Sequence, residues 1–152
     1  MNVTPIGIVR SSRSEVVDDR WDEETFELVL DPAQFTAEAL FGLETFSHIE
    51  VIYHFDRVPE DQIETGARRP RNNPDWPLVG IFAQRGKNRP NRIGVTVARV
   101  LAVDGTTVTV AGLDAVDGTP ILDIKPWMVE FGPRGPVRQP DWSTDLMAGY
   151  WK

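Results

Sequence analysis

The chain has 152 residues, a formal net charge of −7, two histidines and no cysteine. This length fits one domain with a sizeable core. The lack of cysteine excludes a disulfide scaffold, a thiolate zinc site and a cysteine nucleophile, and two histidines are few for a metal cluster, so we expect no metal. No stretch has the form of a signal peptide or the length of a membrane span, and we therefore expect a cytoplasmic protein.

Charge is distributed unevenly along the chain. Residues 15–31 contain eight acidic residues and Arg20, a local charge of −7, whereas residues 66–99 contain eight basic residues and Asp75, a local charge of +7. The basic segment can form a footprint for RNA phosphates on an otherwise acidic body. The two segments can also attract each other between subunits, or both can be solvated faces.

The first half of the chain contains strand patterns at residues 6–9, 26–30 and 48–55, the last with alternating apolar and polar residues. A short helix is expected near residues 37–43, where apolar residues recur at three- and four-residue spacing. Residues 57–77 are rich in proline, arginine and asparagine, which predicts a long loop.

The second half begins with a strand expected at residues 78–83. Residues 93–103 and 106–113 are expected to form a hairpin, because Asp104-Gly105 tolerates the positive φ of a tight turn. A further strand from residue 120 is expected to place Ile121, Asp123 and Lys125 on one face.

Many short strands with little helix predict a mainly β protein, a small single-domain β-barrel with one or two short helices. The domain is expected to span residues 1–152, with a core over about 5–130 and an irregular tail at 131–152. The tail has a possible helical turn near Leu146, and its aromatic residues are expected to pack over the core or a partner subunit, or to stack on a base.

Two segments carry the strongest chemical signal. Gly80 to Val97, GIFAQRGKNRPNRIGVTV, packs four cationic residues between two apolar runs, which suits the binding of an anion. Asp114 to Trp127, DAVDGTPILDIKPW, places a turn before a strand. Together they indicate a small-molecule or nucleotide pocket built on a sheet. The chain has no G-x-G-x-x-G, complete P-loop or G-x-S-x-G motif, so a Rossmann-type cofactor site is not expected.

With Pro5 to Ser11, PIGIVRS, and Gly42 to Phe55, GLETFSHIEVIYHF, these segments make four blocks in one order. In this order they resemble the TsaA-like (YaeB/TrmO) family, S-adenosylmethionine-dependent tRNA methyltransferases with a small β-barrel. The resemblance implies S-adenosylmethionine as the methyl donor, a homodimer, and a short form without the extra C-terminal domain of the longer tRNA enzymes.

The resemblance also implies which residues contact the methyl donor. Arg85 follows F-A-x, Val95 follows I-G, and the D-G-T-P motif begins at Asp117. The set of donor-contact positions is Arg20, Trp21, Asp22, Asp56, Arg57, Arg85, Val95, Asp117, Gly118, Thr119 and Pro120. Two parts depart from the family pattern: Arg20-Trp21-Asp22 replaces P-R-Q, and Asp56-Arg57 replaces His-Gln.

Side-chain chemistry fits these positions. A guanidinium such as that of Arg85 suits the donor's carboxylate, and Asp117 can accept from ribose hydroxyls or the amino group. The backbone at Gly118 can approach adenine closely. The alternative for D-G-T-P is a simple turn with no ligand.

By resemblance, the methyl acceptor is N6 of threonylcarbamoyladenosine beside the tRNA anticodon. Asp114 and Asp117 are candidates for a base. Seven residues of the basic segment are expected to bind the tRNA: Arg68, Arg69, Arg71, Lys87, Arg89, Asn91 and Arg92. For Arg89-Pro90-Asn91 the alternative is that these residues only fix the loop. Three rival functions stay open: a non-catalytic module for S-adenosylmethionine or another adenosine ligand, a methyltransferase with a different acceptor, and an RNA-binding barrel without a cofactor.

Overall fold

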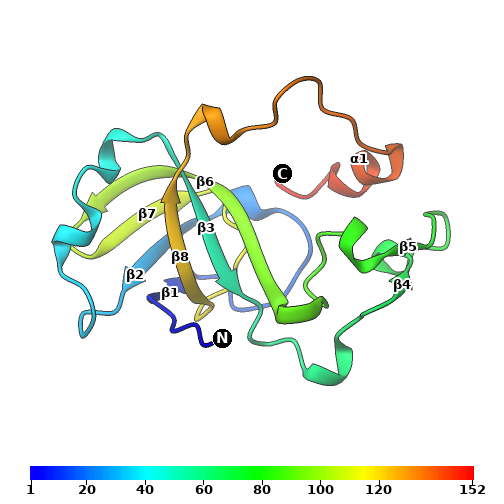
Figure 1. Cartoon of the computed structure of the whole chain (residues 1–152), viewed down its shortest axis with the longest axis horizontal. Coiled ribbons are helices and arrows are strands. Elements are labelled where there is room, and N and C mark those ends of the chain that lie inside the picture. The colour runs from blue at the N-terminus through cyan, green and yellow to red at the C-terminus, as the bar shows by residue number, and fades with distance from the viewer.

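Six antiparallel strands form a closed barrel in the computed structural model, which describes all residues 1–152. The strand order around the barrel is β1-β2-β7-β6-β3-β8 (Figure 1). The strands are β1 (Gly7–Arg10), β2 (Thr25–Leu30), β3 (His48–His54), β6 (Ile93–Asp104), β7 (Thr107–Ala111) and β8 (Pro120–Pro126). The prediction of a mainly β barrel is thus confirmed.

The barrel interior is filled by alternating apolar side chains. On β3, Ile49, Val51 and Tyr53 are almost fully buried, while the residues between them are half-exposed, as the two-residue period of a strand requires. Phe26 and Leu28 of β2 contribute to the same core. The hairpin between β6 and β7 also forms as predicted, with Gly105 at a φ of 58° in its turn.

Short elements lie outside the barrel. A two-stranded sheet pairs β4 (Ala67–Arg68) with β5 (Val79–Gly80), and one α-helix, α1 (Asp141–Met147), lies in the C-terminal tail. The 3₁₀ helices are η1 (Trp21–Glu23), η2 (Ala37–Leu40), η3 (Leu43–Thr45), η4 (Glu60–Gln62), η5 (Pro70–Asn72), η6 (Ile81–Ala83), η7 (Pro90–Arg92) and η8 (Val129–Phe131).

Two predicted elements differ from the structure. The helix expected at 37–43 is two 3₁₀ turns, η2 and η3, because Gly42 between them has a φ of 85° and interrupts the helical backbone. The strand expected at 78–83 is only β5, followed by η6. There the Gln84 side-chain amide donates to the carbonyls of Arg68 and Val79 and closes the turn.

The expected alternation along β8 also fails. Ile52 of β3 is opposite Asp123, but Tyr53 is opposite Ile121, so Leu122 is the extra residue of a bulge. A bulge shifts the faces of the strand by one residue. Ile121 is therefore fully buried, whereas Lys125 and Asp123 are outside and form an ion pair of 2.7 Å.

The antiparallel strands give the barrel two ends of different composition. Strands β1, β7 and β3 finish at one end, where β2, β6 and β8 begin. This end carries Ser11, Asp22 and the 114–118 loop, and we call it the polar end. The other end is covered by η2 and η3. In Figure 1 the loop with β4 and β5 and helix α1 lie on one side of the barrel, away from those two 3₁₀ helices.

No helix is both long and apolar enough to cross a membrane. The structure contains no group of three or more histidine, aspartate or glutamate side chains arranged to hold a metal ion.

Candidate functional site

The D-G-T-P loop is fixed against the end of β1 by hydrogen bonds of its main chain and of the Asp117 side chain. The Gly118 amide donates to the Val9 carbonyl at 2.8 Å, and the Ser11 amide donates to Oδ1 of Asp117 at 3.0 Å. Gly118 has a φ of 82°, a conformation that favours glycine. Thr119 is buried, and its hydroxyl donates to the Val116 carbonyl, so this side chain holds the turn. Pro120 begins β8.

Arg57 joins two loops at the polar end. Its Nη1 donates to the Ser14 carbonyl at 2.6 Å and its Nη2 to the Asp117 carbonyl at 2.8 Å. The guanidinium therefore fixes the D-G-T-P loop to the segment after β1. Its neighbour Asp56 is exposed.

Arg85 lies beside the start of β6. Its Nη2 donates to the Val95 carbonyl at 2.7 Å, and the side chain is otherwise exposed. Gly94, one residue earlier, lies against the ring of Tyr53. A Cβ at this position would be 2.5 Å from that ring, so the glycine of the I-G pair leaves the space that the Tyr53 ring occupies.

The carboxylate of Asp114 also lies at the polar end, and it accepts hydrogen bonds from three hydroxyl groups. Tyr53 donates to Oδ1 at 2.8 Å, Thr96 also contacts Oδ1, and Tyr150 donates to Oδ2. Burial, and then the charge of Asp114, raise the pKa of Tyr53 and of Tyr150. Both phenols therefore keep their protons and act as donors over the physiological pH range.

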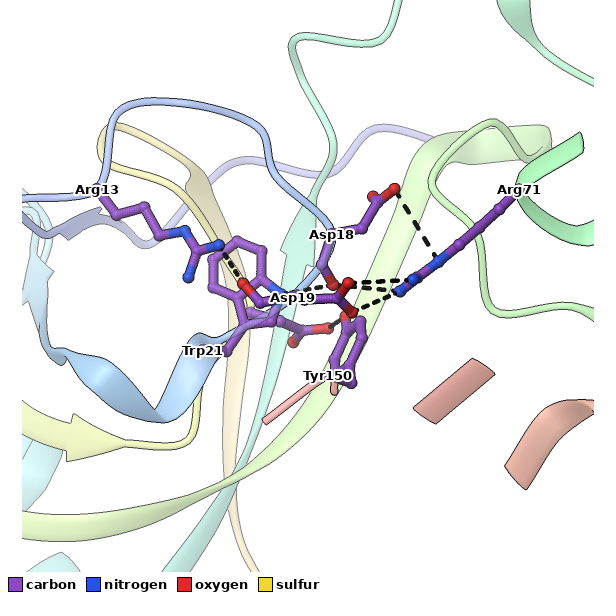
Figure 2. Close-up of polar contacts among 7 residues, drawn as sticks. Arg13, Asp18, Asp19, Trp21, Arg71 and Tyr150 are labelled. Carbon is purple, nitrogen blue, oxygen red and sulfur yellow. Dashed lines mark hydrogen bonds and ion pairs between the residues drawn. The ribbon is translucent and has the colours of Figure 1, made fainter. Parts of the chain in front are cut away.

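Residues 18–22 are held from three sides (Figure 2). The guanidinium of Arg13 stacks on the Trp21 ring, 3.8 Å from its centroid, and donates to the carbonyls of Asp19 and Arg20. Arg71 pairs with Asp19 at 2.9 Å. From the third side, the carbonyls of Gly149, Tyr150 and Trp151 accept the amides of Arg20, Trp21 and Asp22.

Trp21 differs from its neighbours in exposure. Its ring is 5% exposed and belongs to the core, whereas Arg20 and Asp22 are exposed. Contact of this segment with a ligand would therefore come from its backbone or from the two outer side chains.

These contacts connect most of the residues predicted to contact the methyl donor in pairs at the polar end, and we call this group the donor cluster. Arg57 connects to Asp117, Arg85 connects to Val95, and Asp114 connects to residues 20–22 through Tyr150. The seven residues predicted to bind tRNA lie in the loop between β3 and β6, at the same end of the barrel.

Four of those seven side chains bond to their own chain. Arg69 donates to the Trp76 carbonyl, Arg89 to Gln84, Arg92 to Val58, and Arg71 pairs with Asp18 and Asp19. The Nε of Arg68 is buried without a partner. The acidic and basic segments thus meet within one chain, at Arg71, and a guanidinium with one bonded nitrogen still has donors for a phosphate.

Backbone strain is confined to the same region. The non-glycine residues with positive φ are Arg20, Arg71, Asn72, Asn91 and Arg92. Such conformations cost about 1–3 kcal/mol each and cluster at functional sites. Four of the five are residues predicted from the sequence to contact the donor or the tRNA.

Three residues of the cluster were not predicted to belong to it: Tyr53, Thr96 and Arg13. Tyr150 was predicted only to pack or stack. The strand pattern identified Tyr53 as a core residue, but its hydroxyl group points to Asp114 at the polar end. No local signal identifies Tyr150, because 36 positions separate it from Asp114.

Two cavities lie at the opposite end of the barrel. One of about 570 Å³ is lined mostly by apolar residues, which include Ile6 before β1 and residues of β2, η2, η3 and β8, and a second of about 170 Å³ lies beside η2. No residue that was predicted to contact the methyl donor or the tRNA lines either cavity. Each lining includes one carboxylate, Asp123 in the first cavity and Glu44 in the second, but neither includes a cationic group for the carboxylate of a zwitterionic nucleoside.

Comparison with known proteins agrees with the fold and the motifs. Residues 18–132 match the model of the tRNA-methyltransferase O N-terminal domain. The chain belongs to this family.

Among relatives, human tRNA (adenine(37)-N6)-methyltransferase is 35% identical over 102 residues, which cover 67% of this chain and 23% of the human protein. A probable S-adenosyl-L-methionine-binding protein of Pyrococcus abyssi is 34% identical over 139 residues, covering 88% of this chain and 72% of that protein. A crystal structure of TrmO from Pseudomonas aeruginosa superimposes with a TM-score of 0.72 at 30% identity, covering 91% of this chain and 60% of that one. The chain thus spans under a quarter of the human relative and about three fifths of the solved structure.

Proposed function

We propose that this protein is an S-adenosylmethionine-dependent methyltransferase that acts on N6 of threonylcarbamoyladenosine beside the tRNA anticodon. The observation that carries the proposal is the cluster at the polar end, where four separate segments predicted to contact the methyl donor lie together: residues 20–22, Arg57, residues 85–95 and residues 117–120. Family membership and the names of the human and Pyrococcus abyssi relatives support it.

The side chains at the polar end fit the methyl donor. Arg85 uses one nitrogen on the Val95 carbonyl and keeps the rest of its fork for a carboxylate. Asp117 uses Oδ1 on the Ser11 amide and keeps Oδ2 for a ribose hydroxyl or an amino group. Gly118 is exposed and has no side chain, so an adenine edge can approach its backbone.

The donor, when bound, supplies a methyl group on a sulfonium. The role of the protein is then to fix the donor and the acceptor nitrogen in line, since alignment supplies up to roughly 7–11 kcal/mol in ideal intramolecular reactions. The hydrogen bonds of Arg57 and Arg13 hold the loops of this site in place and so serve that alignment.

We propose that tRNA phosphates bind along the loop between β3 and β6. This loop carries most of the local charge of +7 and lies at the same end as the donor cluster. Affinity for tRNA is then expected to fall by roughly 0.7 to 0.9 log units per log unit of salt for each phosphate neutralised. Filter binding at several salt concentrations measures this slope, and a slope near zero would exclude phosphate contacts.

The decisive test is mass spectrometry of tRNA nucleosides from a strain that lacks the gene. We expect N6-methylated threonylcarbamoyladenosine to disappear and to return when the gene is restored on a plasmid. If the methylated nucleoside is undiminished, and no second enzyme supplies it, tRNA is not the acceptor.

A second candidate is a module that binds S-adenosylmethionine without catalysis. The Pyrococcus abyssi relative, which this chain covers over most of its length, is named for binding alone. Calorimetric binding of S-adenosylmethionine, with no methyl transfer to tRNA by the purified protein, would favour this function.

We also propose that the protein is a homodimer and acts in the cytoplasm. Arg71 pairs with Asp18 and Asp19 of its own chain, so these charges are less available to attract a second subunit. The proposal of a dimer is therefore supported mainly by the family resemblance. Light scattering at micromolar protein and low salt tests it, and a strictly monomeric mass would refute it.

A further inference from the structure

The segment Gly149–Trp151, here called the strap, is an integral part of the polar end. Its carbonyls accept the amides of Arg20, Trp21 and Asp22 at 3.2, 3.1 and 2.7 Å. Those amides lie at the start of η1, where a helix leaves its first donors unpaired. Tyr150 and Trp151 meet edge to face, with ring centroids 5.1 Å apart, and both pack on the core.

Tyr150 of the strap donates a hydrogen bond to one oxygen of the Asp114 carboxylate. Both carboxylate oxygens accept hydrogen bonds from hydroxyl groups. No cation forms an ion pair with Asp114, since the ion pairs of the structure are those of Arg71 and Lys125. Because partly buried charges are normally paired, this half-buried carboxylate favours a cation as its missing partner.

Three of the roughly four acceptor positions of the carboxylate are occupied by hydroxyl groups. The nearby cation is that of Arg85, whose charge acts on Tyr150 and lowers its pKa, against the raising effects of burial and of Asp114. Arg85 already has a proposed partner in the carboxylate of the methyl donor. Arg85 bonds to the Val95 carbonyl and the next residue, Thr96, contacts Asp114, so the cation and the anion attach to neighbouring residues of β6, as a zwitterionic ligand requires.

We propose that Tyr150 is a positioning residue of the methyl-donor site, and that it holds Asp114 as a fixed anion facing the cationic methionyl part of the donor. This inference rests on the proposed function and deepens it. Asp114 then orients the donor through charge and takes no proton, a role different from the base expected from the sequence.

The test compares three ligands that differ in positive charge. S-adenosylmethionine has a sulfonium and an ammonium, S-adenosylhomocysteine has only the ammonium, and 5′-methylthioadenosine has neither. Calorimetry on the full chain measures each affinity for the native protein, Asp114→Asn and Tyr150→Phe. Asp123→Asn, on the outer face of β8, is the matched control.

Asp114→Asn is expected to weaken S-adenosylmethionine roughly ten- to a hundredfold and to leave 5′-methylthioadenosine unchanged. A loss confined to S-adenosylmethionine identifies the sulfonium as the partner, and a loss shared with S-adenosylhomocysteine identifies the ammonium. Tyr150→Phe is expected to show the same ligand ranking with a smaller loss, and it keeps the test open if Asp114→Asn does not fold.

Equal losses for all three ligands, or none for any, would overturn the inference and leave the proposed function standing. If the native protein binds none of the three, the proposed function fails first and this inference fails with it.

Discussion

The two ends of the barrel have the same strands but opposite chemistry. At the end covered by η2 and η3, apolar residues surround two cavities, and positive φ angles occur only at glycine. At the polar end, a carboxylate, several guanidinium groups and all non-glycine residues with positive φ occur together. The contrast indicates where a charged ligand is to be expected, which is beside polar groups held in fixed positions and not in an apolar cavity.

The largest expected effect comes from removing the charged groups at the polar end. Arg85→Ala and Asp117→Ala are each expected to weaken S-adenosylmethionine, Arg85→Ala roughly ten- to a hundredfold, because a charge-assisted contact is worth about 1.5–3 kcal/mol. Phe41→Ala, in an exposed residue that lines the apolar cavity, is the control and is expected to bind normally. Calorimetry compares the three variants. Unchanged affinity in both polar-end variants would remove these residues from the site.

The secondary structure can be predicted from the sequence in some parts of the chain and not in others. The alternation of Ile49, Val51 and Tyr53 and the Asp104-Gly105 turn identify a strand and a hairpin, because both are local patterns with a direct backbone cause. The bulge at Leu122 and the 3₁₀ turns around Gly42 depend on packing and main-chain geometry that no periodicity records.

For the site, the motif blocks indicated positions, but the contacts between them come from the fold. The hydrogen bond from Tyr150 to Asp114 and the pairing of Arg71 with Asp19 join segments that no sequence spacing relates. The basic segment was predicted to bind tRNA, with the alternative that residues 89–91 only fix the loop, and Arg89 and Arg92 do bond to carbonyls of their own loop.

A smaller effect on affinity for the methyl donor is expected to distinguish two arginines of the loop between β3 and β6. Both Arg69→Glu and Arg71→Glu are expected to weaken tRNA binding, because each reverses a charge near the proposed phosphate contacts. Only Arg71→Glu is expected also to weaken S-adenosylmethionine, by up to about fivefold, since it repels Asp18 and Asp19 beside the donor segment and exposed ion pairs contribute up to about 1 kcal/mol.

The measurement is the affinity of each variant for tRNA and for the methyl donor. Arg69 bonds only to the Trp76 carbonyl and so serves as the matched control. If Arg71→Glu loses tRNA affinity alone, the basic loop and the donor cluster are independent.

The smallest expected effect is on stability at high pH. Burial and the charge of Asp114 raise the pKa of Tyr53 and Tyr150 above the unfolded value of about 10. Above about pH 10 the unfolded chain releases protons that the folded chain retains, so the free energy of unfolding falls as pH rises. The stabilisation is complete below about pH 10. Urea unfolding from about pH 9 to 11.5 is expected to show a shallower fall in Tyr150→Phe, and equal slopes would contradict the shifted pKa of Tyr150.

The most direct test of the central claim is nuclear magnetic resonance during titration with S-adenosylmethionine, because it reports both ends of the barrel at once. We expect the largest changes at the amides of Arg20, Val95 and Gly118, at the polar end. The amides of Phe41 to Phe46, beside the apolar cavity, are expected to change little. Changes confined to that opposite end would contradict the assignment of the methyl-donor site.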